Sequence, residues 1–538
     1  MTPLQRLRST TLGYIGPSTV AVGSDAVSPK PAAWSYFNAP NIGSSEFRAD
    51  TMLLLTDGSV LIHNGEDPSP RAEWYRLTPD MSQADPNQRY ARGTWSGPTR
   101  MLNTRQFFSS AVLRDGRVYV IGGEYSDSGN DSPLGEIFDP ITNTWTALNK
   151  PADFSWVAGD ASGCVLADGR VLLAALDQPR TALWNPANNT WTESGRAFGT
   201  RPRSSKTGDC NEETWTLLPD GTVLAMETTN SPQGTEIYDP TTDLWTPVAS
   251  VPPNLALLAV TDDSTTPPTV SSPNELGPAV LLHSGVVFAV GGTGHTALYD
   301  PVTGWTAGPD FGPNTAPKPI TPLMTAIDAP GSVLPSNKVF CVVGNTRNEG
   351  GDDPFWSGPT VFYEYDPTLN KLSALPADLQ PTTNEGDTWM ARLLLLPTGQ
   401  LLFSSGQRTI ALFTPAASDP PPNPAWRPTL TGYAATMVAG KSYPISGIQM
   451  NGLTPANSYG DDAQMATNFP IVQVTNRAIH TSVYLRTHDF SSLGIAPGNT
   501  STAIVDLPAH LTPGAYDLIV IANGIPSAAV SVTITALT

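Results

Sequence analysis

Apolar runs alternate with short polar turns along most of the chain, and the turns carry a repeating signature. In its clearest copy, SSAVLRDGRVYVIGG at 109–123, two apolar runs flank Asp-Gly. Asp-Gly supplies the positive φ that a two-residue hairpin needs, so this pattern predicts two paired antiparallel strands. About 25 to 30 residues later comes an Asp-Pro turn and a Trp, as in IFDPITNTW ending at Trp145. Each copy therefore predicts one four-stranded antiparallel sheet.

The signature recurs at intervals of roughly 50 to 65 residues, within reach of the kelch period. Its turns fall at seven places: 57–58, 115–116, 168–169, 220–221, 284–285, near 336–337 and 398–399. A single sheet leaves its hydrophobic faces bare, so the copies are expected to close radially. We therefore predict an all-β fold with a seven-bladed kelch-type β-propeller over residues 32–426. The segment 32–41 has the pattern of an outer strand that completes the last blade.

The repeats stop at SDPPPNPAW (418–426), a stiff Pro-rich passage. In the following residues, apolar and polar positions alternate over short runs such as TSVYLRTH and AYDLIVIANG. The Asp-Pro turn followed by a Trp does not recur there. This texture predicts an immunoglobulin-like β-sandwich over 427–538. Residues 1–31 carry little pattern and are expected to form an N-terminal arm.

Composition narrows the function classes. The net charge of −19 argues against binding to nucleic acid or to an anionic membrane. No apolar stretch is long enough to span a bilayer. The chain has three cysteines, so we do not expect a disulfide framework. The N-terminus has basic residues but no continuous apolar core, so we expect no signal peptide, and the compartment stays open.

Three segments of the C-terminal part resemble one known family. These are NGLTPANSYGDDAQ (451–464), RTHDFSSLGI (486–495) and TPGAYDLIVIANGIPSAAVSVTI (512–534). Together with the repeats they resemble galactose oxidase and glyoxal oxidase, the copper radical oxidases. The resemblance implies a kelch propeller followed by a small sandwich. It also implies that His488 stands in the loop that bears a copper-ligating histidine.

The other copper residues of that family are not matched. Counting from the repeats, Trp389 and Met390 replace the family's Tyr-His pair. Asp160 or Phe107 replaces the radical tyrosine, and no cysteine precedes Cys164. We therefore expect no Cys-Tyr radical cofactor. No dinucleotide-binding fingerprint supplies another redox centre.

Charged residues stand instead where the innermost strands begin, and these starts converge on the propeller axis. They are Arg48, Asp50, Arg105, Asp160, Asp209, Glu212, Glu213, Glu275, Glu385 and Asp387. Crowded carboxylates raise one another's pKa, which is the condition for a general acid near neutral pH.

Three interpretations of the axis stay open. In the first, the charges are structural and pair around a water-filled channel. In the second, His488 with Asp50, Asp160 and Glu212 binds a divalent metal. In the third, Asp160 and Glu212, with His488, catalyse hydrolysis or elimination on a sugar, and Arg48 and Arg105 bind a uronate or another acidic group.

For function, we favour a binding module over an enzyme because no complete catalytic set can be identified. A glycan, another small molecule or a protein would be held at the axial pocket or at the loops above it. The expected ligand-binding residues are Arg48, Asp50, Arg105, Glu213, Glu275, Asp387 and Trp389. The alternative is a carbohydrate-active enzyme, a hydrolase, lyase or non-radical metal-dependent oxidase, that uses the axial carboxylates and His488.

Overall fold

The computed structural model describes most of the chain and shows an all-β protein. The described residues are 30–41, 47–65, 71–126, 131–133, 135–149, 158–176, 178–194, 210, 213–226, 234–251, 275–317, 319, 321–346, 356, 358–460 and 464–537. They form nine β-sheets. Their helical elements are short 3-10 turns: η1 (Pro86–Gln88), η3 (Ala377–Leu379), η4 (Thr388–Met390) and η5 (Pro424–Trp426).

Seven of these sheets share one plan of four antiparallel strands, to which one of them adds a fifth short strand, and we number them in chain order. Sheet one contains β2 (Ala49–Leu54), β3 (Val60–Asn64), β4 (Glu73–Thr78) and β5 (Thr94–Arg100). Sheet two contains β6 (Ser109–Val112), β7 (Val118–Ile121), β8 (Gly135–Asp139) and β9 (Thr144–Leu148). Sheet three contains β10 (Gly163–Val165), β11 (Val171–Ala175), β12 (Gln178–Asn185) and β13 (Thr190–Glu193).

Sheets four to seven repeat the plan. Sheet four contains β14 (Thr214–Leu217), β15 (Val223–Met226), β16 (Thr235–Asp239) and β17 (Leu244–Pro247). Sheet five contains β18 (Ala279–Leu281), β19 (Val287–Val290), β20 (Thr296–Asp300) and β21 (Gly304–Ala307). Sheet six contains β22 (Gly331–Val333), β23 (Val339–Val343), β24 (Val361–Asp366) and β25 (Lys371–Ala374). Sheet seven contains β26 (Ala391–Leu395), β27 (Leu401–Ser405), β28 (Thr409–Thr414) and β1 (Ala33–Asn38).

The first hairpin of each sheet turns where the sequence predicted it. Gly58 and Gly116, for example, have φ of 78° and 82°, and Asn337 takes the same role in sheet six with φ of 74°. In sheet two the Asp115 carboxylate also accepts a hydrogen bond from the backbone N–H of Arg117, 3.0 Å away. The Asp thus stabilises the turn while the Gly supplies its backbone conformation.

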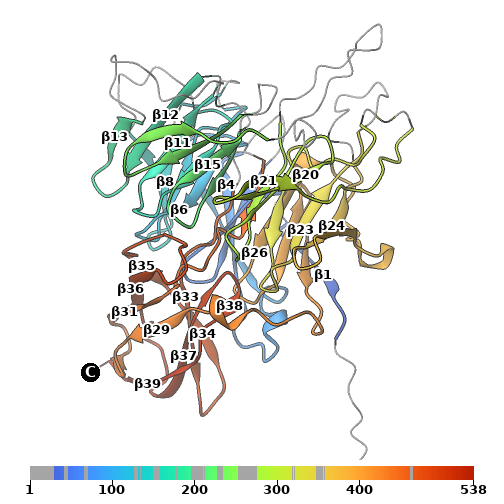
Figure 1. The fold of residues 1–538 in the computed structure, drawn as a ribbon. Coiled ribbons are helices and arrows are strands. Elements are labelled where there is room, and N and C mark those ends of the chain that lie inside the picture. The colour runs from blue at the N-terminus through green and yellow to red at the C-terminus, as the bar shows by residue number, and fades with distance from the viewer. Residues whose placement is uncertain are drawn as a thin grey trace, which may run out of the picture.

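The seven sheets form a propeller-like ring (Figure 1). The first strands of successive sheets contact one another in a closed cycle, from β2 through β6, β10, β14, β18, β22 and β26 back to β2. The ring joins two distant parts of the chain because β1 pairs with β28, so that Trp34 lies opposite Phe413. This confirms that the segment 32–41 supplies an outer strand of the last sheet.

Two further sheets form the C-terminal part, drawn in orange and red below the ring in Figure 1. One contains β29 (Thr429–Gly432), β31 (Ser442–Ile448), β36 (Thr500–Asp506) and β35 (Thr487–His488). The other contains β30 (Thr436–Val438), β39 (Val530–Thr535), β37 (Gly514–Ala522), β33 (Ile471–Asn476), β34 (Ser482–Leu485) and β38 (Ile525–Pro526). These sheets contact the hairpin-turn end of the ring: the Thr487 N–H donates to the Thr56 carbonyl and the Phe490 N–H to the Arg114 carbonyl.

Residues 454–460 and 464–468, which we call the axial segment, leave the C-terminal part and enter the ring. Its short strand β32 (Asn457–Ser458) pairs with β22 of sheet six. The Asn457 side chain also accepts a hydrogen bond from the Leu395 N–H of sheet seven, and the Ser458 hydroxyl accepts one from the Ala279 N–H of sheet five. Farther along, the Tyr459 hydroxyl donates to the Trp389 carbonyl. The axial segment therefore satisfies backbone groups that would otherwise lie bare inside the ring.

His283 illustrates how the junction with the C-terminal part is packed. It lies beside the first turn of sheet five, is 4% exposed, and its ring stacks on Trp426 with 4.8 Å between ring centroids. Its Nε2 is buried without a hydrogen-bond partner among the described residues. Burial lowers the pKa of His283 to about 4, because the charged imidazolium would be desolvated.

This buried histidine predicts an acid-sensitive fold. The unfolded chain, with a histidine pKa near 6.5, binds the proton more tightly than the folded one. The contribution of the neutral His283 side chain to the free energy of unfolding is complete above pH ~6.5. It is lost as pH falls from there towards 4, by about 1.4 kcal/mol per pH unit. Urea unfolding at pH 4.5 to 7 should therefore show a shallower pH slope for His283→Gln than for the wild type. Exposed His510 is the matched control, and an unchanged slope in His283→Gln would contradict the assignment.

Candidate functional site

The axial end of the ring opposite the C-terminal part holds a buried charge cluster. Asp50, in the first strand of sheet one, lies 3.3 Å from His63 Nδ1 and 3.0 Å from Arg392 Nη2. The Arg392 guanidinium stacks over the Tyr459 ring of the axial segment, 4.4 Å from its centroid. Arg392 and His63 are fully buried and Asp50 nearly so, so this cluster ties sheets one and seven to the axial segment.

The electrostatics of this cluster keep Asp50 ionised. Burial by itself would raise the pKa of Asp50, but the Arg392 charge and the His63 hydrogen bond outweigh it and lower the pKa below its usual value. A carboxylate held in this state cannot serve as a general acid near neutral pH. Asp50 therefore fits a structural role better than a proton-donating one.

Other expected axial residues are also occupied within the protein. Arg105 is fully buried and forms an ion pair with Glu136 at 2.8 Å, so it does not face a ligand as the sequence suggested. Glu213 is fully buried and accepts a hydrogen bond from the Trp215 indole at 2.9 Å. Glu275 and Asp387 likewise accept hydrogen bonds, from the Trp356 indole and the Gly358 N–H, both at 2.8 Å.

The expected catalytic pair is only partly described. Asp160 is half-buried, whereas Glu212, like Asp209, lies outside the described residues. Within the described part of the chain, no group of three or more His, Cys, Asp or Glu side chains is placed to hold a metal ion. The expected metal ligands were His488, Asp50, Asp160 and Glu212. The three of them that the structure describes, His488, Asp50 and Asp160, do not form a metal site together.

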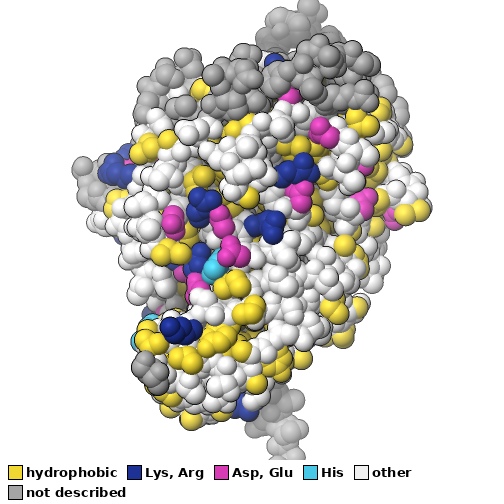
Figure 2. All heavy atoms as spheres, turned by 90° about the vertical axis from the view of Figure 1, so that its left-hand side faces the viewer, with side chains coloured by type: hydrophobic (Ala, Val, Ile, Leu, Met, Phe, Trp, Pro, Cys, Tyr) yellow, Lys and Arg dark blue, Asp and Glu magenta, His cyan; other side chains and the backbone are white. Residues whose placement is uncertain are grey.

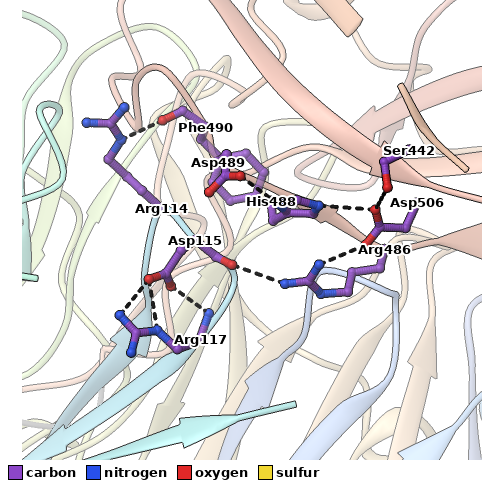
Figure 3. A network of polar contacts seen from close by, with 9 residues as sticks. All are labelled: Arg114, Asp115, Arg117, Ser442, Arg486, His488, Asp489, Phe490 and Asp506. Carbon is purple, nitrogen blue, oxygen red and sulfur yellow. Dashed lines mark hydrogen bonds and ion pairs between the residues drawn. The ribbon is translucent and has the colours of Figure 1, made fainter. Parts of the chain in front are cut away.

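His488 lies at the other end of the ring. Its neighbour Thr487 hydrogen-bonds the Thr56 carbonyl, and a strand rises about 3.3 Å per residue, so roughly 20 Å separate this level from Asp50. Both imidazole nitrogens have partners at the surface, Asp489 at 2.9 Å and Asp506 at 3.2 Å (Figure 3). The structure thus does not bring His488 to the axial carboxylates. The axial segment enters the ring, and the loop 486–495 does not.

The surroundings of His488 serve as a joint between the two parts of the chain. Arg486 pairs with Asp506 at 2.8 Å and also donates to the Asp115 carbonyl in the turn of sheet two (Figure 3). Asp115 in turn pairs with Arg117 at 2.7 Å. On the side of the molecule where β35 lies, acidic and basic side chains are interspersed rather than gathered by sign (Figure 2). This pattern fits mutual neutralisation better than a binding field of one charge.

A small cavity opens beside the buried cluster, between sheets one, two and seven. It has a volume of about 50 Å³ and is lined by Arg48, Asp50, Gly65, Gln106, Trp389, Met390 and Gly406. A row of aromatic rings leads away from it: Trp389 lies 5.8 Å from Phe107, and Phe107 lies 6.1 Å from the partly exposed Tyr125. We call the cavity and this row the axial pocket.

Sequence reasoning missed three residues of this region as site residues. Gln106 and Phe107 follow Arg105 directly, at the same strand start, but the sequence predicted a ligand-binding role only for Arg105, and it gave Phe107 only as a replacement of the radical tyrosine. Tyr459 lies in the axial segment, where no hydrophobic alternation marks its position. Neutral and aromatic side chains at strand starts are therefore as informative here as the charged ones.

Comparison with known proteins supports the repeat assignment. Residues 107–151, which include all of sheet two, match the Kelch motif. The match is confined to this one segment of the chain. The chain is 27% identical to galactose oxidase of Gibberella zeae over 117 residues, 22% of this chain and 15% of that protein. It is 30% identical to the spermatocyte protein spe-26 of Caenorhabditis elegans over 153 residues, 26% of this chain and 24% of that protein. These matches thus span a quarter or less of either relative.

Solved structures resemble the chain only distantly. The extracellular domain of a hybrid two-component system from B. thetaiotaomicron is 11% identical, with a TM-score of 0.43 over 95% of this chain and 60% of that one. YCF48 from Cyanidioschyzon merolae is 11% identical, with a TM-score of 0.40 over 71% of this chain and 98% of that one. No helix in the described part of the chain has the length and apolar character to cross a membrane.

The buried cluster leads to a test of its structural role. Arg392→Met should lower the free energy of unfolding by about 3 to 5 kcal/mol, because Asp50 would stay buried without its cationic partner. Replacing both charges in Asp50→Asn/Arg392→Met should restore much of this loss. Urea unfolding measures both variants. Arg477→Met, in the exposed pair with Asp517, is the control and should be nearly neutral. A double variant no more stable than Arg392→Met would contradict this interpretation.

Proposed function

We propose that the chain is a ligand-binding kelch propeller whose axial pocket holds a glycan. In this proposal the seven sheets are blades, and the two C-terminal sheets form an immunoglobulin-like sandwich. The contact cycle of the first strands and the Kelch motif at 107–151 support the propeller. We retain the inference that the galactose-oxidase-like architecture works here without a Cys-Tyr radical cofactor, since the family's positions fall on Trp389, Met390, Asp160 and Phe107.

The observation that carries the proposal is the aromatic row beside a polar cavity at the axis. Binding sites combine apolar and aromatic walls with a few well-placed polar groups. Trp389, Phe107 and Tyr125 supply ring faces and edges, and Arg48 and Gln106 supply hydrogen-bonding groups at the inner end. Sugar rings present both an apolar C–H face and hydroxyl groups, so they suit this combination.

Binding is favoured over catalysis by the state of the axial acids. Glu213, Glu275 and Asp387 accept hydrogen bonds within the protein, and Asp50 is neutralised by Arg392. A carbohydrate-active enzyme of altered chemistry would instead need a carboxyl group with a raised pKa aimed at the ligand. Such an enzyme remains the alternative, and it rests on Asp160 and Glu212.

The proposal predicts that binding depends on the aromatic row. In a glycan panel followed by calorimetry, the wild type should bind at least one oligosaccharide. Trp389→Ala should weaken that binding roughly tenfold or more, because a central aromatic contact is lost. Tyr433→Ala, which removes an exposed aromatic side chain of the C-terminal part, should bind like the wild type. Equal affinity of the wild type and Trp389→Ala would place the glycan elsewhere and overturn the proposal.

A further inference from the structure

The cavity of the axial pocket is too small for a sugar ring. A water molecule occupies about 30 Å³ in the liquid, so about 50 Å³ admits a group the size of roughly two waters. A carboxylate is such a group. The ligand would therefore insert one substituent into the cavity and leave its rings along Trp389 and Phe107.

The charge balance of the cavity favours a negative substituent. Asp50 is the acidic residue that lines it, and its two oxygens already face Arg392 and His63. Arg48 also lines the cavity, and within the described part of the chain it has no acidic partner. Its Nε is buried there without a hydrogen-bond partner. The fixed charges of Asp50, Arg392 and Arg48 thus sum to one positive charge beside the cavity.

Gln106 adds a second buried polar group that is not satisfied. The side chain is 4% exposed, and its Oε1 has no hydrogen-bond partner among the described residues. Its backbone is fixed in both directions by Glu124, through hydrogen bonds of 3.2 and 2.7 Å. A buried polar group without a partner is unfavourable, and a bound ligand or water would relieve this cost.

The position of Arg48 is also fixed. Its N–H donates to the Asn64 side chain at 2.9 Å, and its carbonyl accepts from the Gly65 N–H at 3.0 Å. Both contacts come from the end of the neighbouring strand β3. The guanidinium is therefore carried on an anchored backbone, which reduces the entropy lost when it binds a ligand.

We propose that the axial pocket recognises the carboxylate of a uronic acid residue in an acidic glycan; this rests on the glycan-binding function proposed above. Arg48 binds the carboxylate, since a planar guanidinium matches its two oxygens. The Gln106 amide donates to the same carboxylate and accepts from a neighbouring hydroxyl. Trp389 and Phe107 contact the sugar rings outside the cavity.

The test compares two oligosaccharides of equal length, tetragalacturonate and a neutral galactose tetramer, by calorimetry on the full chain. The wild type should bind the acidic tetramer at least ten times more tightly. Arg48→Gln should lose most of this preference, because its affinity for the acidic tetramer should fall much more than its affinity for the neutral tetramer. Arg48→Lys, which keeps the charge but not the fork, should retain only part of the preference. Arg477→Gln has the same net charge as Arg48→Gln and should behave like the wild type.

The possible outcomes distinguish failure of the uronate assignment from failure of the proposed glycan binding. Equal affinity of the wild type for both tetramers, or an unchanged preference in a folded Arg48→Gln, would overturn the uronate assignment and leave glycan binding intact. No binding of either tetramer, together with no binding in the wider glycan panel, would overturn both. A glutamate-rich peptide that binds more tightly than tetragalacturonate through Arg48 would also overturn the uronate assignment, because the partner would then be a protein.

Discussion

The hydrogen bonds of the axial segment to the inner strands of the ring are the constraint on which the candidate site depends. The axial segment pairs with β22 and satisfies backbone groups of sheets five and seven. Through Tyr459 it also supports the Arg392 guanidinium and the Trp389 backbone. The C-terminal part thus helps to set the position of a pocket at the far end of the ring. It is a structural component of that pocket, although only one short segment reaches it.

Two arginines near the axis show how environment assigns different roles to one side chain. Arg392 contacts Asp50, the Tyr459 ring and the Ala391 carbonyl, so its charge is neutralised inside the protein. Arg48 directly precedes the first strand of sheet one, and its side chain lines the cavity. Sequence alone gives both residues the same chemistry, and only burial and partners distinguish them.

The sequence predicted the fold better than the site. The turns at Gly58 and Gly116 and the closing strand at 33–38 were predictable because local chemistry and alternation determine them. His488 was placed wrongly because the choice of the loop that enters the ring depends on tertiary packing, which leaves no periodic trace. The axial charges were found from their places at strand starts. Their partners, such as Glu136 for Arg105, come from other strands and could not be paired by spacing.

The pairing of β1 with β28 joins residues 371 positions apart, as between Asn38 and Thr409. The chain emerges from the ribosome in order, so β1 is made before its partner and stays unpaired until β28 has been synthesised. Closure of so long a loop is also expected to be a slow step, because the contact order is high. During translation, residues 33–38 are thus an exposed strand without its pairing partner. Such a segment is a site at which a chaperone can bind.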